Sequence, residues 1–160
     1  MVFDDIPIFK KHVREYAVMK KCMFEFRKAD KSRAYLWCKH RKNQNCLWQV
    51  NAITVPNEPT AKIMFCNLKH TCKRMKGKRN PMCNSRFVAD YMIKTLGVTN
   101  SIPKPMAIMK LHIWPTFRTE IPYWVAAEAR LMILADLHGR FEESYTKIPS
   151  LVKEVKGLDD

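Results

Sequence analysis

Residues 37–72 read WCKHRKNQNCLWQVNAITVPNEPTAKIMFCNLKHTC and contain Cys38, Cys46, His70 and Cys72. Three thiolates and one imidazole are ligands that Zn²⁺ binds in a tetrahedron. Alternate side chains of an extended strand lie on the same side, so His70 and Cys72 can reach one ion. Four protein ligands leave no coordination position for a reactive water. The spacing therefore predicts a structural zinc site, not a catalytic one.

Two other residues, Cys66 and His40, are alternative ligands to this set. Cys66 competes as a ligand, but four residues of strand separate it from His70 by about 13 Å, too far to share one ion. His40 could replace Cys38 but has no paired partner. The acidic start MVFDD leads into no apolar signal core, which favours a reducing compartment and metal binding over disulfides. The remaining cysteines are interpreted as packing residues: Cys22, Cys66 and Cys83.

Two segments carry a resemblance to a known family: residues 46–52 (CLWQVNA) and residues 68–72 (LKHTC). They resemble the Cys-Cys-His-Cys zinc finger of Mutator-like (MULE, MuDR-type) transposases, part of the WRKY superfamily. Residues 9–33 are similar to the leading helix and first strand of that family, and residues 127–156 to the helical segment that precedes its catalytic domain. The resemblance implies an N-terminal DNA-binding region without the catalytic domain.

The first half of the chain shows one helical segment followed by strand patterns. Residues 7–20 predict a helix, with Pro7 near its start and apolar residues at helical spacing. Strands are predicted at 22–27, 34–38, 46–55 and 61–68, with a turn at 29–32. These elements predict an α+β fold. Its core is a small zinc-stabilised antiparallel β-sheet, WRKY-like, with a leading helix and a following helical region.

The second half reads as helical. A helix is expected from Asn84 to a stop at Gly97, and residues 104–114 fit either helix or strand. Residues 121–138 form the clearest helical pattern, ended by Gly139, and a last helix or a pair of short ones reaches about residue 156. Its apolar residues are interpreted as core: Trp124, Ala127, Leu131, Leu134 and Ala135. Two domains are expected, a zinc-finger domain with a basic linker at 1–80 and a helical region at 81–160.

The positive charge is concentrated in one part of the chain. The net charge is +14, and residues 20–79 alone carry sixteen Lys or Arg against three Asp or Glu. A block of one sign is the electrostatic footprint of a polyanion, and nucleic acid is the leading candidate. The basic stretch 73–81 is also a candidate nuclear localisation signal. No apolar run is long enough to span a bilayer.

The family resemblance places DNA recognition on the strand before the first zinc ligand. The chain has FRKADK at residues 26–31 in place of the WRKYGQK signature, so base specificity does not transfer. Arg can bond guanine in two places, whereas Lys usually contacts phosphate. The predicted DNA-binding residues come from the first hairpin and the basic linker: Arg27, Lys28, Lys31, Arg33, Lys73, Arg74, Lys76, Lys78 and Arg79.

The sequence as a whole predicts a zinc-dependent, nuclear, double-stranded DNA-binding protein derived from a transposase. No catalytic residues are predicted, because His112, His138 and the scattered Glu residues form no recognisable nucleophile or acid–base set. Two alternatives remain open. One is a protein-interaction module that binds a full-length transposase or another nuclear partner. The other is RNA binding, which is less favoured because no aromatic stacking motif is evident.

Overall fold

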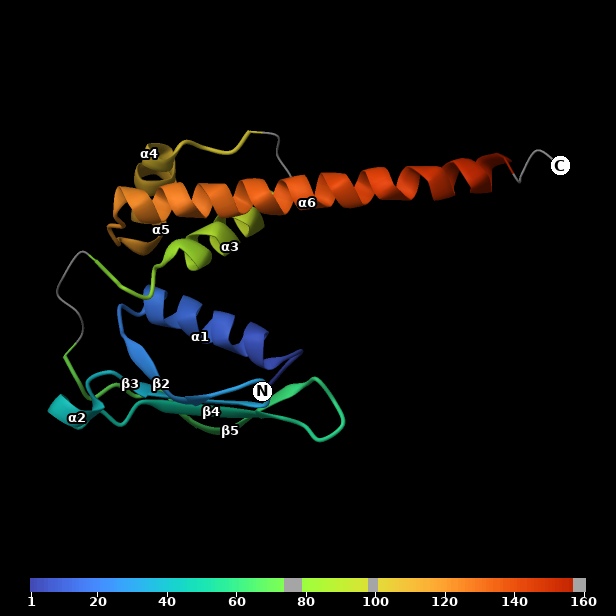
Figure 1. The fold of residues 1–160 in the computed structure, drawn as a ribbon. Coiled ribbons are helices and arrows are strands. Elements are labelled where there is room, and N and C mark those ends of the chain that lie inside the picture. The colour runs from blue at the N-terminus through green and yellow to red at the C-terminus, as the bar shows by residue number, and fades with distance from the viewer. Residues whose placement is uncertain (74–78, 98–100, 157–160) are drawn as a thin grey trace.

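The computed structural model describes residues 1–73, 79–97 and 101–156, with helical side chains described as far as residue 139. A sheet forms one layer, helix α1 (Ile6–Met19) lies on it, and further helices lie beyond α1 (Figure 1). This arrangement confirms the predicted α+β class, with an antiparallel sheet first and a helical region after it. Among the described residues, no helix combines the length and apolar character needed to cross a bilayer.

The sheet has five antiparallel strands in the order β1-β5-β4-β3-β2. Four of them match the predicted strands: β2 (Phe24–Ala29), β3 (Arg33–Cys38), β4 (Gln49–Thr54) and β5 (Ala61–Asn67). The sequence did not predict β1 (Val2–Phe3), which pairs with the start of β5, or the single helical turn α2 (Arg41–Gln44). Two residues of strand and one turn of helix are too short to show a periodicity.

Hydrogen bonds at both termini fix where helix α1 begins and ends. Asp5 caps the N-terminus, its carboxylate accepting a hydrogen bond from the Ile8 N–H at 2.6 Å. At the C-terminus the Cys22 N–H donates to the Ala17 carbonyl and the Lys21 N–H to the Val18 carbonyl. This is the Schellman arrangement, in which Lys21 takes the left-handed position (φ 51°) that glycine usually occupies. A lysine there costs on the order of 1 kcal/mol more than glycine.

The core of the sheet lies between α1 and the face of β3 and β4 that points toward it. Along β3 the side chains alternate between buried and half-buried positions, which places Ala34, Leu36 and Cys38 on the covered face. Trp48, just before β4, is fully buried. Its ring lies 6.4 Å from Tyr16 of α1 and 5.2 Å from His70. The largest side chain of this core therefore connects the helix to the cysteine cluster.

A second core holds the helical region together. It is built by α3 (Ser85–Leu96), α4 (Pro105–Ala107), the π-helical turn η1 (Ile108–Ile113), α5 (Trp114–Phe117) and α6 (Tyr123–Lys156). The segment 104–114, for which the sequence fitted either type, is helical. Asn84 caps α3 through the Phe87 N–H at 3.0 Å, and Gly97 ends it with a φ of 64°.

Two expectations for the last helix are wrong. Helix α6 does not stop at Gly139, which has no positive φ of the kind that ends α3 at Gly97. The predicted core face is also wrong, since Trp124 and Leu131 are 64% and 65% exposed. The buried face instead carries Val125, Ala126, Ala129 and Ile133. Small alanines let α3 and α6 approach closely, so side-chain size did not identify the packed face.

Helix α1 also contacts the helical region. Val18 belongs to the second core, and the side-chain amide of Asn80 donates to the Ala17 carbonyl at 3.2 Å. Lys11 of α1 pairs with Asp90 of α3 at 3.3 Å. The two cores are separate clusters, joined through helix α1 and through Met82, which packs against both. The division into domains at residues 80 and 81 stays a prediction.

Candidate functional site

Four side chains that are distant in the sequence meet beyond one end of the sheet. Cys38 is the last residue of β3, Cys46 precedes β4, and His70 and Cys72 follow β5. Their ligand atoms all lie within 4.8 Å of one another. The cluster that the spacing predicted is therefore assembled, and it can hold a metal ion.

The distances can be compared with those of a tetrahedral site. With zinc–sulfur and zinc–nitrogen bonds of about 2.3 and 2.0 Å, tetrahedral edges are about 3.8 Å between sulfurs and 3.5 Å between sulfur and nitrogen. Cys38 Sγ lies 3.6 Å from Cys72 Sγ, and His70 Nδ1 lies 3.4 Å from Cys46 Sγ and 3.6 Å from Cys72 Sγ. These edges and the three-sulfur, one-nitrogen donor set fit zinc.

The three thiols differ in how easily they ionise. Desolvation raises the pKa of Cys46, but backbone N–H groups, that of Trp48 foremost, outweigh it and bring this pKa to about 5. Desolvation raises the pKa of Cys38 and of Cys72, and the nearby Cys46 sulfur raises that of Cys72 further. Cys46 is thus the thiol that ionises most readily, and a bound cation would favour ionisation of the other two.

The neighbours of the cluster bury two of its four residues, whereas His70 and Cys72 are half-buried. Cys38, Cys46 and Trp48 are fully buried, and the Trp48 and His70 rings stack with an interplanar angle of 9°. The stacked indole holds the imidazole with Nδ1 toward the sulfurs. The Cys38 sulfur also accepts the His40 backbone N–H at 3.4 Å. His40 therefore contributes its backbone beside the cluster, not a side-chain ligand.

The other cysteines divide into two groups. Cys22 and Cys83 are buried, as expected of packing residues. Cys66 is exposed, so its interpretation as a packing residue is wrong. It lies on β5 next to the short strand β1, which pairs only with residues 61 and 62 and leaves this part of the edge uncovered.

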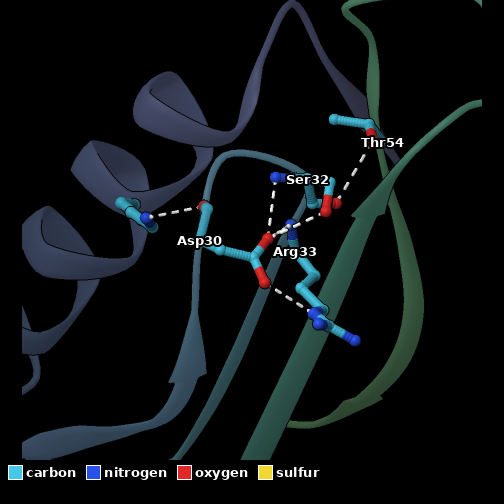
Figure 2. Close-up of polar contacts among 5 residues, drawn as sticks. Asp30, Ser32, Arg33 and Thr54 are labelled. Atoms are coloured by element: carbon cyan, nitrogen blue, oxygen red, sulfur yellow. Dashed lines mark hydrogen bonds and ion pairs between the residues drawn. The ribbon is translucent and has the colours of Figure 1, made fainter.

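The β2–β3 hairpin at the opposite end of the sheet is held by local hydrogen bonds (Figure 2). The Asp30 carboxylate accepts from the Ser32 and Arg33 N–H groups at 2.8 and 2.9 Å and from Arg33 Nε at 2.6 Å. These contacts, Arg33 first, hold the pKa of Asp30 well below its usual range. Thr54 of β4 joins the turn by donating its N–H to the Ser32 carbonyl at 2.7 Å.

Arg27 occupies a special place on β2. The register shifts between Phe26 and Lys28, so Arg27 is the extra residue of a β-bulge on an edge strand. Its guanidinium lies 5.1 Å from the centre of the Trp37 ring. A bulge redirects a side chain and leaves its backbone unpaired. The structure thus presents Arg27 on the solvent-facing side of the sheet.

Comparison with known proteins identifies the segment that carries most of these features. Residues 1–63 match the family model described as MuDR family transposase. The N-terminal segment is therefore similar to the MuDR transposase family. The match covers Cys38 and Cys46 and ends within β5, before His70 and Cys72. The family match therefore does not reach the second pair of cluster residues.

Two other comparisons add little to the MuDR assignment. No curated protein matches the sequence. A solved structure, described as the crystal structure of AFT2 in complex with DNA, aligns with a TM-score of 0.42 and 14% identity. The alignment covers 57% of this chain and 75% of that chain. A likeness of this strength establishes neither a shared fold nor a shared ligand.

The predicted DNA-binding residues of the MuDR-type segment and its linker are spread over different environments. Lys28 and Lys31 are exposed on the hairpin, and Arg33 is half-buried with its Nε engaged by Asp30. Lys73 and Arg79 are exposed, and the backbone of Arg79 bridges to Glu120. Arg74, Lys76 and Lys78 lie outside the described residues. A DNA-binding role for these residues stays a prediction.

The sequence reasoning missed the partners of Arg27. Trp37 lies beneath Arg27 and Arg41, and its indole N–H donates to Glu25 at 2.7 Å. Arg41 in turn donates to Gln49 at 2.7 Å. The alternation along β3 already places Trp37 on the opposite face from Leu36 and Cys38, and this signal could have identified it. The position of Arg41, in a helical turn of four residues, carries no such signal.

Proposed function

We propose that this chain is a transposase-derived protein that binds double-stranded DNA and depends on zinc for the fold of its binding domain. The observation that carries the proposal is the convergence of Cys38, Cys46, His70 and Cys72 at the end of a MuDR-family sheet. The net charge of +14, concentrated in residues 20–79, supplies the attraction for phosphate.

Zinc would act as a structural cross-link. Cys38, Cys46, His70 and Cys72 would hold it, and it would supply cross-links among the end of β3, the approach to β4 and the segment after β5. The Trp48 ring stacks on both His70 and Tyr16 and so connects the zinc site to α1. A small sheet buries little apolar surface, so a bound metal would contribute much of its stability.

The edge of β2 is the proposed DNA-recognition surface. Among the described strands β2 has no neighbour beyond it in the sheet, and every residue of β2 after Phe24 is exposed. The bulge redirects Arg27, whose two-pronged guanidinium suits guanine in the major groove. Lys28 and Lys31 lie beside it, and their ammonium groups suit contacts with phosphate oxygens. The protein thus separates base contacts from backbone contacts along one hairpin.

The direct test combines metal analysis with DNA binding. Purified protein is expected to carry one zinc per chain and to bind duplex DNA with an affinity that falls steeply with salt. A binding-site selection on random duplexes then shows whether the sequence is read. Folded protein that contains no zinc, or tight DNA binding after complete zinc removal, contradicts the proposed dependence.

A second candidate function rests on a specific observation in the helical region. Trp124 and Leu131 lie seven residues apart on α6, so both are on one exposed apolar side of the helix. Such a side is typical of protein contacts. We propose it as a candidate surface for a nuclear protein partner such as a full-length transposase. Co-purification that is lost in Trp124→Ala/Leu131→Ala protein would support it.

The proposed role is binding, without catalysis, in the nucleus. The MuDR match falls on residues 1–63, and the features that carry the proposal are a potential zinc site and a basic hairpin. Metal-dependent nuclease and strand-transfer assays on duplex DNA provide the check for catalysis. Localisation of a fluorescent fusion, with and without the basic residues 73–79, checks the nuclear assignment.

A further inference from the structure

A second basic feature lies beside the cysteine cluster, away from the hairpin. A pocket of about 350 Å³ opens between the end of α1, His40 shortly after β3 and the segment after β5. Its polar lining consists mainly of cations and one phenol: Tyr16, Lys20, Lys21, His40, Lys69 and Lys73. Within the described part of the chain, no Asp or Glu lines this pocket.

Two residues of the cysteine cluster, His70 and Cys72, also line the pocket, but the cluster does not balance so much positive charge. A zinc ion with three thiolates and a neutral imidazole carries a net charge of about −1. Four lysines line the pocket even when His40 is not counted. Three positive charges are thus left without a compensating group. Like charges gathered in one concavity repel one another, and this cost is recovered when an anion binds there.

The backbone at Lys21 is a second, independent sign. This lysine occupies the left-handed position at the end of α1, with a φ of 51°. Glycine adopts this conformation without strain, whereas a lysine does so at a cost. Lys21 nevertheless lines the pocket with its long cationic side chain. Its side chain thus adds to the pocket a cation that glycine could not supply.

We infer that this pocket binds a phosphate group of the DNA backbone, as a second anchor apart from the hairpin. The inference rests on the proposed DNA-binding function and extends it. Cys22 and Met23, which also line the pocket, directly precede β2, whereas the hairpin turn follows it. Six residues of strand span about 20 Å. The major groove is only about 12 Å wide, so a strand edge placed in it reaches phosphates at both ends.

The test compares salt dependence in matched lysine variants. Lys20→Gln/Lys69→Gln removes two pocket charges, and Lys62→Gln/Lys110→Gln removes two exposed charges elsewhere. Each lost phosphate contact lowers the salt slope by about 0.9, so two contacts reduce the affinity change between 50 and 200 mM salt by about twelvefold. This reduction is expected for the pocket variant and not for the control. Zinc content and circular dichroism, unchanged in both, show that the fold is intact.

Lys21→Gly provides a sharper variant, because its two effects have opposite directions. Glycine relieves the strained backbone, so the midpoint of thermal unfolding is expected to rise. The same change removes a pocket cation, so duplex affinity is expected to fall with a lower salt slope. A merely structural Lys21 would give the rise in stability with unchanged DNA binding, and this result would overturn the inference.

The outcomes separate this inference from the proposed function. If the wild-type protein binds no duplex, both are wrong. If it binds duplex and the pocket and control variants share one salt slope, only the phosphate anchor is wrong. Inorganic phosphate is titrated separately by NMR. Saturable shifts at residues 20–22 and 69–73 with phosphate alone, together with an unchanged duplex slope in the pocket variant, would assign the pocket to free phosphate and overturn the DNA anchor.

Discussion

The sheet region and the helical region are held together in different ways. In the sheet region the buried core ends at four potential metal ligands, and two of its fully buried residues, Cys38 and Cys46, belong to that cluster. The helical core consists of aliphatic, aromatic and sulfur side chains such as Val88, Met92 and Ile108, away from the cluster. The first core therefore adjoins a potential metal site, whereas the second consists of packed side chains.

This difference bears on how the two regions are used. The side of the sheet region that faces solvent carries arginines, lysines and a bulged edge strand, which suit a polyanion. The helical region exposes Trp124 and Leu131, which suit a protein. Helix α1 packs against both regions, so a structural change in the sheet region can reach the helical region. The experiments below test how far the two regions are independent.

The largest effect is expected from loss of the metal. Zinc binding contributes on the order of 10 kcal/mol in small structural sites. Cys46→Ser, or chelation at neutral pH, should therefore unfold the sheet region while the helical region keeps much of its ellipticity. The matched control is Cys66→Ser at an exposed cysteine outside the cluster. Complete unfolding of both regions in one transition would show that α1 makes them a single cooperative unit.

The converse experiment destabilises the helical core. Met92 is fully buried on α3, and Met92→Ala should cost about 2–5 kcal/mol through lost packing and the cavity left behind. Denaturant unfolding followed by far-ultraviolet circular dichroism measures this loss. Zinc affinity, titrated with a competing chelator, should stay the same. A parallel loss of zinc affinity would contradict the separation of the two cores.

A smaller effect separates base reading from phosphate contact within the sheet region. Arg27→Ala should cost about 1–3 kcal/mol on a selected site and flatten discrimination at one base pair. Lys31→Ala should weaken all duplexes alike, because lysine contacts phosphate. Both variants are titrated on the selected site and on a scrambled duplex. Equal losses of Arg27→Ala on both duplexes would remove the recognition role and leave general DNA binding intact.

The smallest effect concerns the hairpin turn and its pH dependence. Arg33 and Ser32 hold the pKa of Asp30 below its ordinary value. The contribution of Asp30 to stability is therefore present above about pH 4 and is lost as the pH falls toward the lowered folded-state pKa. Asp30→Asn should reduce this acid-side slope slightly, and thermal unfolding between pH 2 and 6 at constant salt measures it. An unchanged slope would mean that the turn keeps its contacts in the unfolded chain.

Several features could be predicted from the sequence because their causes are local. Asn84 and Gly97 bound α3 through hydrogen bonds and backbone angles that involve their own neighbours. The strands were recognisable by their alternation. The four cluster residues were recognisable by spacing, because metal chemistry admits few donor sets.

Other features were decided only by the tertiary structure. Which side of α6 is buried depends on how closely α3 approaches, and this favoured Ala126 and Ala129 over Trp124 and Leu131. The lysine pocket gathers Lys20, Lys21, Lys69 and Lys73 from segments nearly fifty residues apart, within a charge block that looked uniform in the sequence. Local hydrogen bonding and periodicity can be seen in a single segment. Packing and electrostatic fields depend on which segments become neighbours, and only the folded chain determines that.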